Sequence, residues 1–195
     1  MNDLEKQNSL IAAEADEILN ALGLLRMLNK YGKPIPWGSY ALGLMTWRDL
    51  DIYLETNVMS EGRFFELGSD VVAILKPQRM HYRNELIART PGNPLGLYWG
   101  IYVTRNEFPE EWKIDVWAID SAQLRNHAKQ FADLKEAIGT KHKAAILAIK
   151  NNYYKHPEYR RGFTSMEIYH VVIEKGIKNV EEFEEWLLAE KGISS

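Results

Sequence analysis

The stretch GSYALGLMTWRDLDIYL, residues 38–54, decides the fold, because it joins a Gly-Ser turn to an alternating run that carries two aspartates. In a β-strand successive side chains point to opposite faces. The aliphatic residues between and after the acids would enter a core, which leaves Asp49 and Asp51 side by side on the other face. Two neighbouring carboxylates repel each other and raise one another's pKa. The stretch therefore predicts a half-buried strand whose polar face attracts a cation.

A second run, WKIDVWAI at residues 112–119, repeats this arrangement and places Asp115 on the polar face of another expected strand. If the two strands are neighbours, the three carboxylates converge. Hard oxygen ligands without histidine or cysteine select Mg²⁺ or Mn²⁺ over zinc, and Mg²⁺ is the first choice. The sequence therefore predicts a magnesium site formed by Asp49, Asp51 and Asp115.

Gly38 and Ser39 supply the features of a phosphate site. A glycine lets a phosphate approach the backbone closely. A short helix that begins at Ser39 would offer free amide N–H groups and the positive end of the helix dipole. Together with the three acids, this turn predicts a site for a metal-bound polyphosphate.

The wider pattern predicts an α+β fold, with a mixed-sheet core at residues 1–120 and a C-terminal helical region at residues 121–195. Helical periodicity covers residues 3–30 and 61–76. Thr164 with Glu167, and Asn179 with Glu182, have the spacing of helix N-caps. Alternating runs separated by turn residues predict three strands after the second helix, within QRMHYRNELIA (78–88), LGLYWGIYV (95–103) and EWKIDVWAI (111–119).

Composition excludes several classes of protein. The 195 residues include 24 basic and 27 acidic side chains, a net charge of -3, so the overall balance does not favour nucleic acid as a partner. The absence of cysteine excludes disulfides, thiolate zinc sites and thiol nucleophiles. The charged N-terminus and the lack of a long apolar run predict a cytoplasmic protein without a membrane anchor, and no pattern sets its oligomeric state.

These residues resemble the nucleotidyltransferase superfamily, the polymerase-β-like fold that includes aminoglycoside and lincosamide nucleotidyltransferases. The signature of that family is a hydrophobic residue, Gly, then Gly or Ser, a spacer, Asp-x-Asp between hydrophobic residues, and a later strand with a third acid. The resemblance covers roughly residues 15–120 and implies a mixed β-sheet with helices packed on one face, followed by a C-terminal helical annex. The matching residues here are Trp37-Gly38-Ser39, Asp49-Leu50-Asp51-Ile52 and Ile114-Asp115-Val116.

The resemblance implies a two-metal transfer of a nucleoside monophosphate from an NTP, with ATP as first choice, to a hydroxyl group. Asp49 and Asp51 would ligate both Mg²⁺ or Mn²⁺ ions, and Asp115 would complete the shell of the catalytic ion. Gly38 and Ser39 would hold the terminal phosphates. The small, acidic chain favours a small-molecule acceptor, an antibiotic among them, over a polynucleotide. A partner protein, as for antitoxin-type nucleotidyltransferases, is the alternative acceptor, and a non-catalytic binding module that retains the fold is the alternative class.

For several further side chains the sequence leaves the role open. Arg48 could contact phosphate or pair with an exposed acid, and Lys143 or Lys150 could reach the triphosphate or lie on a solvated basic face. Trp117 shares the face of Asp115 and could line the pocket. Glu85 and Asp120 are minor candidates for the base that accepts the proton of the acceptor hydroxyl.

Overall fold

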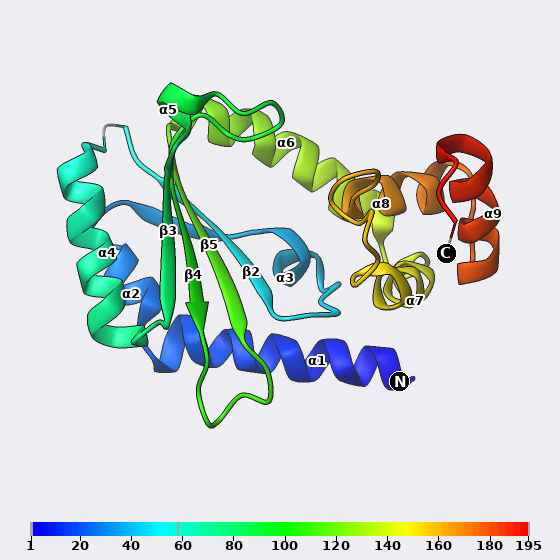
Figure 1. The fold of residues 1–195 in the computed structure, drawn as a ribbon, viewed down its shortest axis with the longest axis horizontal. Helices are drawn as coiled ribbons and strands as arrows, with labels where there is room; N and C mark the ends of the chain where they lie inside the picture. Colours follow the sequence, from blue (N-terminus) through cyan, green and yellow to red (C-terminus); the bar gives the residue numbers. More distant parts are fainter. Residues whose placement is uncertain (1, 58, 195) are drawn as a thin grey trace.

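The computed structural model describes residues 2–57 and 59–194 and contains a five-stranded mixed sheet with the strand order β1-β2-β5-β4-β3 (Figure 1). All neighbouring strands run antiparallel except β2 and β5, which are parallel. The predicted α+β mixed sheet is therefore confirmed. Its strands are β1 (Lys33–Pro36), β2 (Asp49–Glu55), β3 (Arg79–Asn84), β4 (Leu97–Val103) and β5 (Trp112–Ile119).

The parallel pair of β2 and β5 decides where the acids lie. Its register sets Asp49 opposite Lys113, and Asp51 opposite Asp115. Side chains in register on neighbouring strands share a face of the sheet, so the aspartates from the two strands lie on the same side. The expectation that these two strands are neighbours is confirmed.

The opposite face of the sheet carries the larger apolar core. Leu50, Ile52 and Leu54 on β2 are fully buried there, together with Ile114 and Val116 on β5. Burial at alternate positions is what the period-2 pattern predicts for a sheet with one covered face. Four helical segments pack on this face: α1 (Asp3–Asp16), the π-helical turn η1 (Glu17–Ala21), α2 (Leu24–Leu28) and α4 (Glu61–Leu75).

Two expected elements differ from the structure. Residues 3–30 do not form one helix, because Gly23 adopts a left-handed conformation with φ 81° and separates η1 from α2. The strand expected within residues 78–88 ends at Asn84, whose side chain accepts a hydrogen bond from the amide of Leu86 at 3.1 Å and begins the short helix α5 (Glu85–Ala88). The strand ends there because the asparagine side chain forms this local hydrogen bond with the backbone.

The C-terminal part is helical, as expected, and has its own apolar cluster. The predicted caps are confirmed: Thr164 and Glu167 form a capping box, and Asn179 accepts a hydrogen bond from the amide of Glu182. Among the described residues, no helix combines the length and apolar character needed to cross a bilayer. The helices are α6 (Ser121–Ile138), α7 (Lys143–Tyr153), α8 (Ser165–Glu174) and α9 (Val180–Lys191).

The second cluster crosses the boundary that the sequence suggests at residue 120. Leu42, the last residue of the short helix α3 (Gly38–Leu42), and Leu44 pack with Ile146, Leu147 and the other buried residues of the helical region. Helix α1 also contacts α7, and Figure 1 shows the N-terminal end of α1 next to α7. The division at residue 120 stays a prediction.

Candidate functional site

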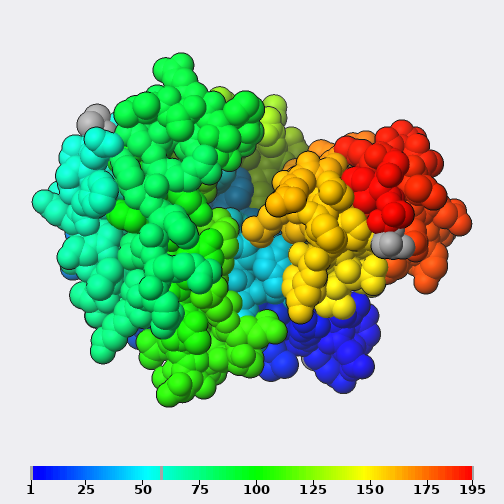
Figure 2. All heavy atoms as spheres, in the orientation of Figure 1, coloured from blue at the N-terminus to red at the C-terminus, as the bar shows by residue number. Residues whose placement is uncertain are grey.

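A cavity of about 500 Å³ lies between the polar face of the sheet and the helical region. Figure 2 shows the surface hollowed between these two parts of the molecule. The walls of the cavity include Gly38 and Ser39 of α3, the three aspartates, and aromatic side chains such as Trp37 and Phe131. The three predicted metal ligands therefore line one cavity together with Gly38 and Ser39 of the predicted phosphate site.

Gly38 lies directly against Asp51. With a φ of 58°, Gly38 has a backbone conformation that favours glycine, and a Cβ there would lie 2.1 Å from Oδ2 of Asp51. Both conditions exclude a larger side chain. The glycine of the turn is thus required for the close approach of α3 to the acid on β2, as well as for the room it leaves at the cavity wall.

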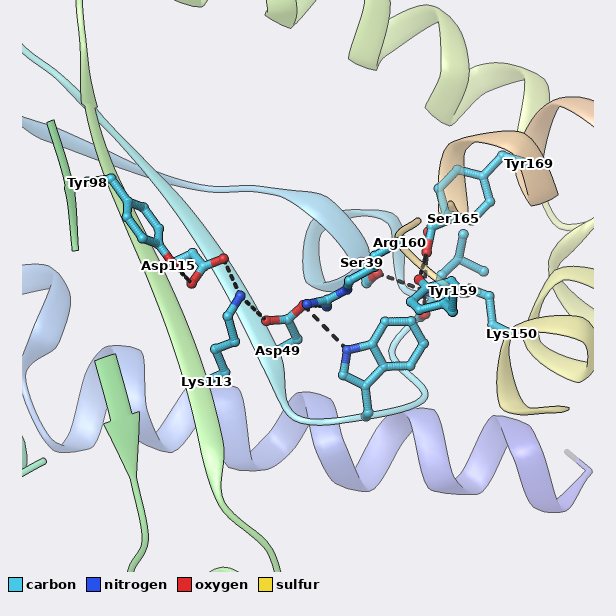
Figure 3. Close-up of polar contacts among 12 residues, drawn as sticks. Ser39, Asp49, Tyr98, Lys113, Asp115, Lys150, Tyr159, Arg160, Ser165 and Tyr169 are labelled. Carbon is cyan, nitrogen blue, oxygen red and sulfur yellow. Dashed lines mark hydrogen bonds and ion pairs between the residues drawn. The ribbon is translucent and has the colours of Figure 1, made fainter. Parts of the chain in front are cut away.

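Two cations neutralise part of the aspartate cluster (Figure 3). Lys113 Nζ lies 2.5 Å from Asp115 Oδ2 and 3.3 Å from Asp49 Oδ1. Arg160, from the loop between α7 and α8, donates to Asp49 Oδ2. Tyr98 on β4 donates its hydroxyl to Asp115 Oδ1 at 2.8 Å. The acids at the two ends of the cluster are therefore held by side chains from β4, β5 and the helical region.

The middle acid is left with surplus negative charge. Burial, with added repulsion from Asp49 and Asp115, raises the pKa of Asp51 from 3.8 to about 7. Burial also raises the pKa of Asp115, although Lys113 counteracts this effect. Burial alone would lower the pKa of Lys113, but the carboxylates of Asp49 and Asp115 raise it above its ordinary value. Within the described chain, hydrogen bonds and ion pairs reach Asp49 and Asp115 but not the Asp51 carboxylate.

The donor set fits a hard divalent cation such as Mg²⁺ or Mn²⁺. It consists of carboxylate oxygens on one face of adjacent strands, and the charge on Asp51 is one that such an ion would relieve. In the described residues, however, no group of three or more acidic or histidine side chains is already arranged to hold one ion. Lys113 and Arg160 pull the outer acids into ion pairs instead.

Lys150 positions the Ser39 side chain by a hydrogen bond. The Lys150 ammonium is fully buried and donates to Ser39 Oγ at 2.7 Å, to the Leu44 carbonyl at 2.6 Å and to the Tyr169 hydroxyl at 3.2 Å. Burial lowers the pKa of Lys150 to about 7, against the opposing effect of Asp49 and Asp51. The three protons of the ammonium each have an acceptor, so Lys150 positions Ser39 and has no proton left for a ligand.

The other two expected phosphate ligands lie elsewhere. Arg48 forms ion pairs with Glu14 at 2.6 Å and Glu110 at 3.0 Å, as its alternative interpretation predicted, and lines a smaller cavity of about 260 Å³ beside Asp49. Lys143 does not line either cavity, and its ammonium lies beside Gly43. Phosphate binding by these two residues stays a prediction that their contacts do not favour.

The remaining candidates lie away from the carboxylates or have structural roles. Glu85 is buried and accepts hydrogen bonds from the Thr90 amide at 2.8 Å and from Asn93 at 3.0 Å, which anchors the loop after α5. Asp120 accepts the first amides of α6 as its N-cap. Trp117 packs against Tyr98, with ring centroids 4.6 Å apart.

Sequence reasoning missed Lys113 and Arg160 as members of the site. Lys113 precedes Asp115 by two positions, so the alternation of β5 already placed both on one face. Arg160 carried no signal, because it lies in an irregular loop far along the chain from Asp49.

Comparison with known proteins agrees with this fold. No family model matches the chain, and no curated protein matches it. A crystal structure of the Cid1 poly(U) polymerase, with Mg and 3'-dATP bound, superimposes with a TM-score of 0.56 at 15% sequence identity. The match covers 83% of this chain and 48% of that one, so the chain spans about half the length of the polymerase. The chain thus has a nucleotidyltransferase-like α+β fold.

Proposed function

We propose that this chain is a metal-dependent nucleotidyltransferase, which transfers a nucleoside monophosphate from an NTP to an acceptor hydroxyl and releases pyrophosphate. The observation that carries the proposal is the packing of Gly38 against Asp51, in a cavity where Asp51 and Asp115 are register partners on parallel strands. A Gly-Ser turn beside three acids brings the elements of a phosphate site and of a metal site into one cavity. The nucleotidyltransferase fold of the chain supports the same reaction class.

The acids would bind the metal ions, and the Gly-Ser turn would bind the phosphates. Asp49, Asp51 and Asp115 would hold Mg²⁺ or Mn²⁺, ions that in such sites activate an acceptor hydroxyl and stabilise a departing pyrophosphate. Ser39, whose hydroxyl oxygen accepts a hydrogen bond from Lys150, would turn its own O–H to a phosphate oxygen. Gly38, without a side chain, allows that phosphate to approach the turn.

The acceptor that fits the cavity best is a small molecule, and an antibiotic hydroxyl is one candidate. The cavity places aromatic walls near the acids: Trp37 contacts Phe131 with ring centroids 4.2 Å apart, and both line it. Flat apolar walls with a few polar groups are typical of small-molecule sites. The net charge of -3 gives no general attraction for a polynucleotide.

A protein acceptor is the second candidate, and one surface feature favours it. Leu86, Ile87 and Leu95 are 51%, 78% and 43% exposed and flank the loop whose residues Gly92 and Pro94 line the cavity. Exposed apolar side chains next to a loop of the site would give another protein an apolar surface to contact.

The test is equilibrium binding of the four common NTPs with Mg²⁺ or Mn²⁺, with ATP first, followed by a pyrophosphate-release assay against hydroxyl-bearing acceptors. Asp49→Asn should weaken metal-dependent NTP binding by about tenfold or more, because it removes a charged ligand. Asp133→Asn, an exposed acid on α6 outside the cavity, is the matched control. Wild-type protein that binds no NTP, or Asp49→Asn protein that binds as well as wild type, would leave the non-catalytic binding module as the better description.

A further inference from the structure

Lys113 and Arg160 occupy carboxylate oxygens that a divalent ion would need. Both oxygens of Asp49 are engaged, Oδ1 by Lys113 at 3.3 Å and Oδ2 by Arg160. Lys113 also pairs with Asp115 Oδ2 at 2.5 Å. A divalent ion that binds these acids would therefore compete with the two cations for the same oxygens.

The charges of an incoming nucleotide make an exchange of partners favourable. A divalent ion alone meets the repulsion of Lys113 and Arg160, and an NTP alone meets the repulsion of the three aspartates. A triphosphate bound to two divalent ions is nearly neutral as a unit. Its entry would give each carboxylate a metal ion and each displaced cation a phosphate, without adding net charge to the cavity.

We infer that Lys113 and Arg160 are phosphate-binding residues that exchange partners: they pair with Asp49 and Asp115 in the nucleotide-free protein and move to phosphate oxygens when a metal-bound NTP enters. The inference rests on the proposed function and extends it, because it makes metal and nucleotide bind as a unit. It also assigns to these two side chains the phosphate contacts that Arg48 and Lys143 are poorly placed to make.

Both cations border the cavity that the nucleotide would enter. Lys113 and Arg160 line the same cavity as Gly38 and Ser39. The Arg160 side chain is 50% exposed, so its ion pair with Asp49 is weakened by solvent and easily broken. A guanidinium also matches two oxygens of a phosphate at once.

The backbone at Arg160 is fixed although its side chain is accessible. Arg160 has a φ of 69°, in the left-handed region, and its amide donates to the Phe163 carbonyl at 2.7 Å. A non-glycine residue keeps this conformation where its surroundings impose it. The loop therefore presents the guanidinium at one place beside Asp49, from which the flexible side chain can turn to a phosphate.

The test measures two affinities with opposite expected changes. Mn²⁺ binding is followed by the EPR signal of free Mn²⁺, first for Mn²⁺ alone and then with the α,β-methylene analogue of the NTP that wild type binds best. Arg160→Gln and Lys113→Met should bind Mn²⁺ alone about threefold or more tightly than wild type, because a competing cation is gone. The same variants should bind the Mn²⁺-loaded analogue about tenfold more weakly, because a charged phosphate contact is lost.

Two further variants keep the result interpretable. Arg161→Gln removes the same charge from the neighbouring exposed position, which lines neither cavity, and should leave both affinities at wild-type values. Arg160→Lys retains the charge and should recover most of the binding of the analogue. Circular dichroism of each variant confirms that it is folded before its affinity is compared.

The result that would refute this inference differs from the result that would refute the proposed function. If wild type binds the Mn²⁺-loaded analogue but both affinities of Arg160→Gln and Lys113→Met fall together, or neither changes, the exchange is refuted and the nucleotidyltransferase proposal stands. If wild type does not bind the loaded analogue at all, both are refuted.

Discussion

Replacement of Asp51 with asparagine should stabilise the metal-free protein at neutral and alkaline pH. The Asp51 carboxyl is buried against Gly38 and repelled by Asp49 and Asp115, and these effects raise its pKa from 3.8 to about 7. Asparagine has nearly the same shape and no charge, so it removes the repulsion without opening a cavity. A substitution at the centre of the site should thus improve stability while it removes a proposed metal ligand, a trade-off that is common at functional sites.

The magnitude follows from the two pKa values. The unfolded chain releases the Asp51 proton near pH 3.8, whereas the folded protein keeps it until about pH 7. Because the folded state binds the proton more tightly, this group lowers the free energy of unfolding by about 1.4 kcal/mol per pH unit as the pH rises through that window. The roughly 3 units give a cost on the order of 4 kcal/mol, fully present above about pH 7 and absent below about pH 4.

Urea unfolding at pH 5, 6, 7 and 8, with a chelator present, measures this cost. The stability difference between Asp51→Asn and wild type should grow with pH and level off above pH 7. Glu55→Gln, which removes an acid from the same face of β2, is the control for a simple change in net charge. An equal difference at pH 5 and pH 8, or an Asp51→Asn variant that is less stable than wild type at pH 8, would refute the reasoning.

Two further substitutions test the packing of the turn. Gly38→Ala should destabilise the protein by about 2 kcal/mol or more, because the new Cβ would overlap Oδ2 of Asp51 at a strained φ; a thermal unfolding scan measures the loss, and an unchanged midpoint would contradict the close contact. Lys150→Met should remove a pH-dependent gain in stability. Because burial lowers the Lys150 pKa to about 7, the folded protein sheds this proton earlier than the unfolded chain, and wild type should gain about 1.4 kcal/mol per pH unit above pH 7 relative to the variant. If the free energy of unfolding of wild type and of Lys150→Met changes equally between pH 7 and pH 9, that contribution is disproved.

The sheet was the most predictable part of the fold, because the alternation of polar and apolar residues indicates which side chains of a strand are buried. The run from Asp49 to Leu54 and the run around Asp115 each appear as strands with the expected faces. Breaks inside periodic segments were harder to predict. The helical pattern of residues 3–30 continues through Gly23, and only the tertiary structure shows that this glycine turns the chain.

The candidate site was predictable where its residues follow one another along a strand or turn, and unpredictable where they come from separate elements. Gly38, Asp49, Asp51 and Asp115 belong to local patterns that have a recognisable spacing. The amphipathic pattern of α7 left open whether Lys150 faces solvent or protein, and in the structure it is completely buried. Periodicity assigns a residue to a face of its helix, but the partner of that face depends on how distant segments pack.

The helical region completes the site rather than only covering it. Lys150 of α7 holds the Ser39 hydroxyl, and Arg160 from the following loop pairs with Asp49. Leu42 and Leu44, which follow directly on the Gly-Ser turn, are buried in the apolar cluster of that same region. The turn is therefore fixed on one side by Asp51 and on the other by the C-terminal helices. Any shift of these helices against the sheet would move Ser39 relative to the aspartates, and so would change the proposed phosphate and metal parts of the cavity together.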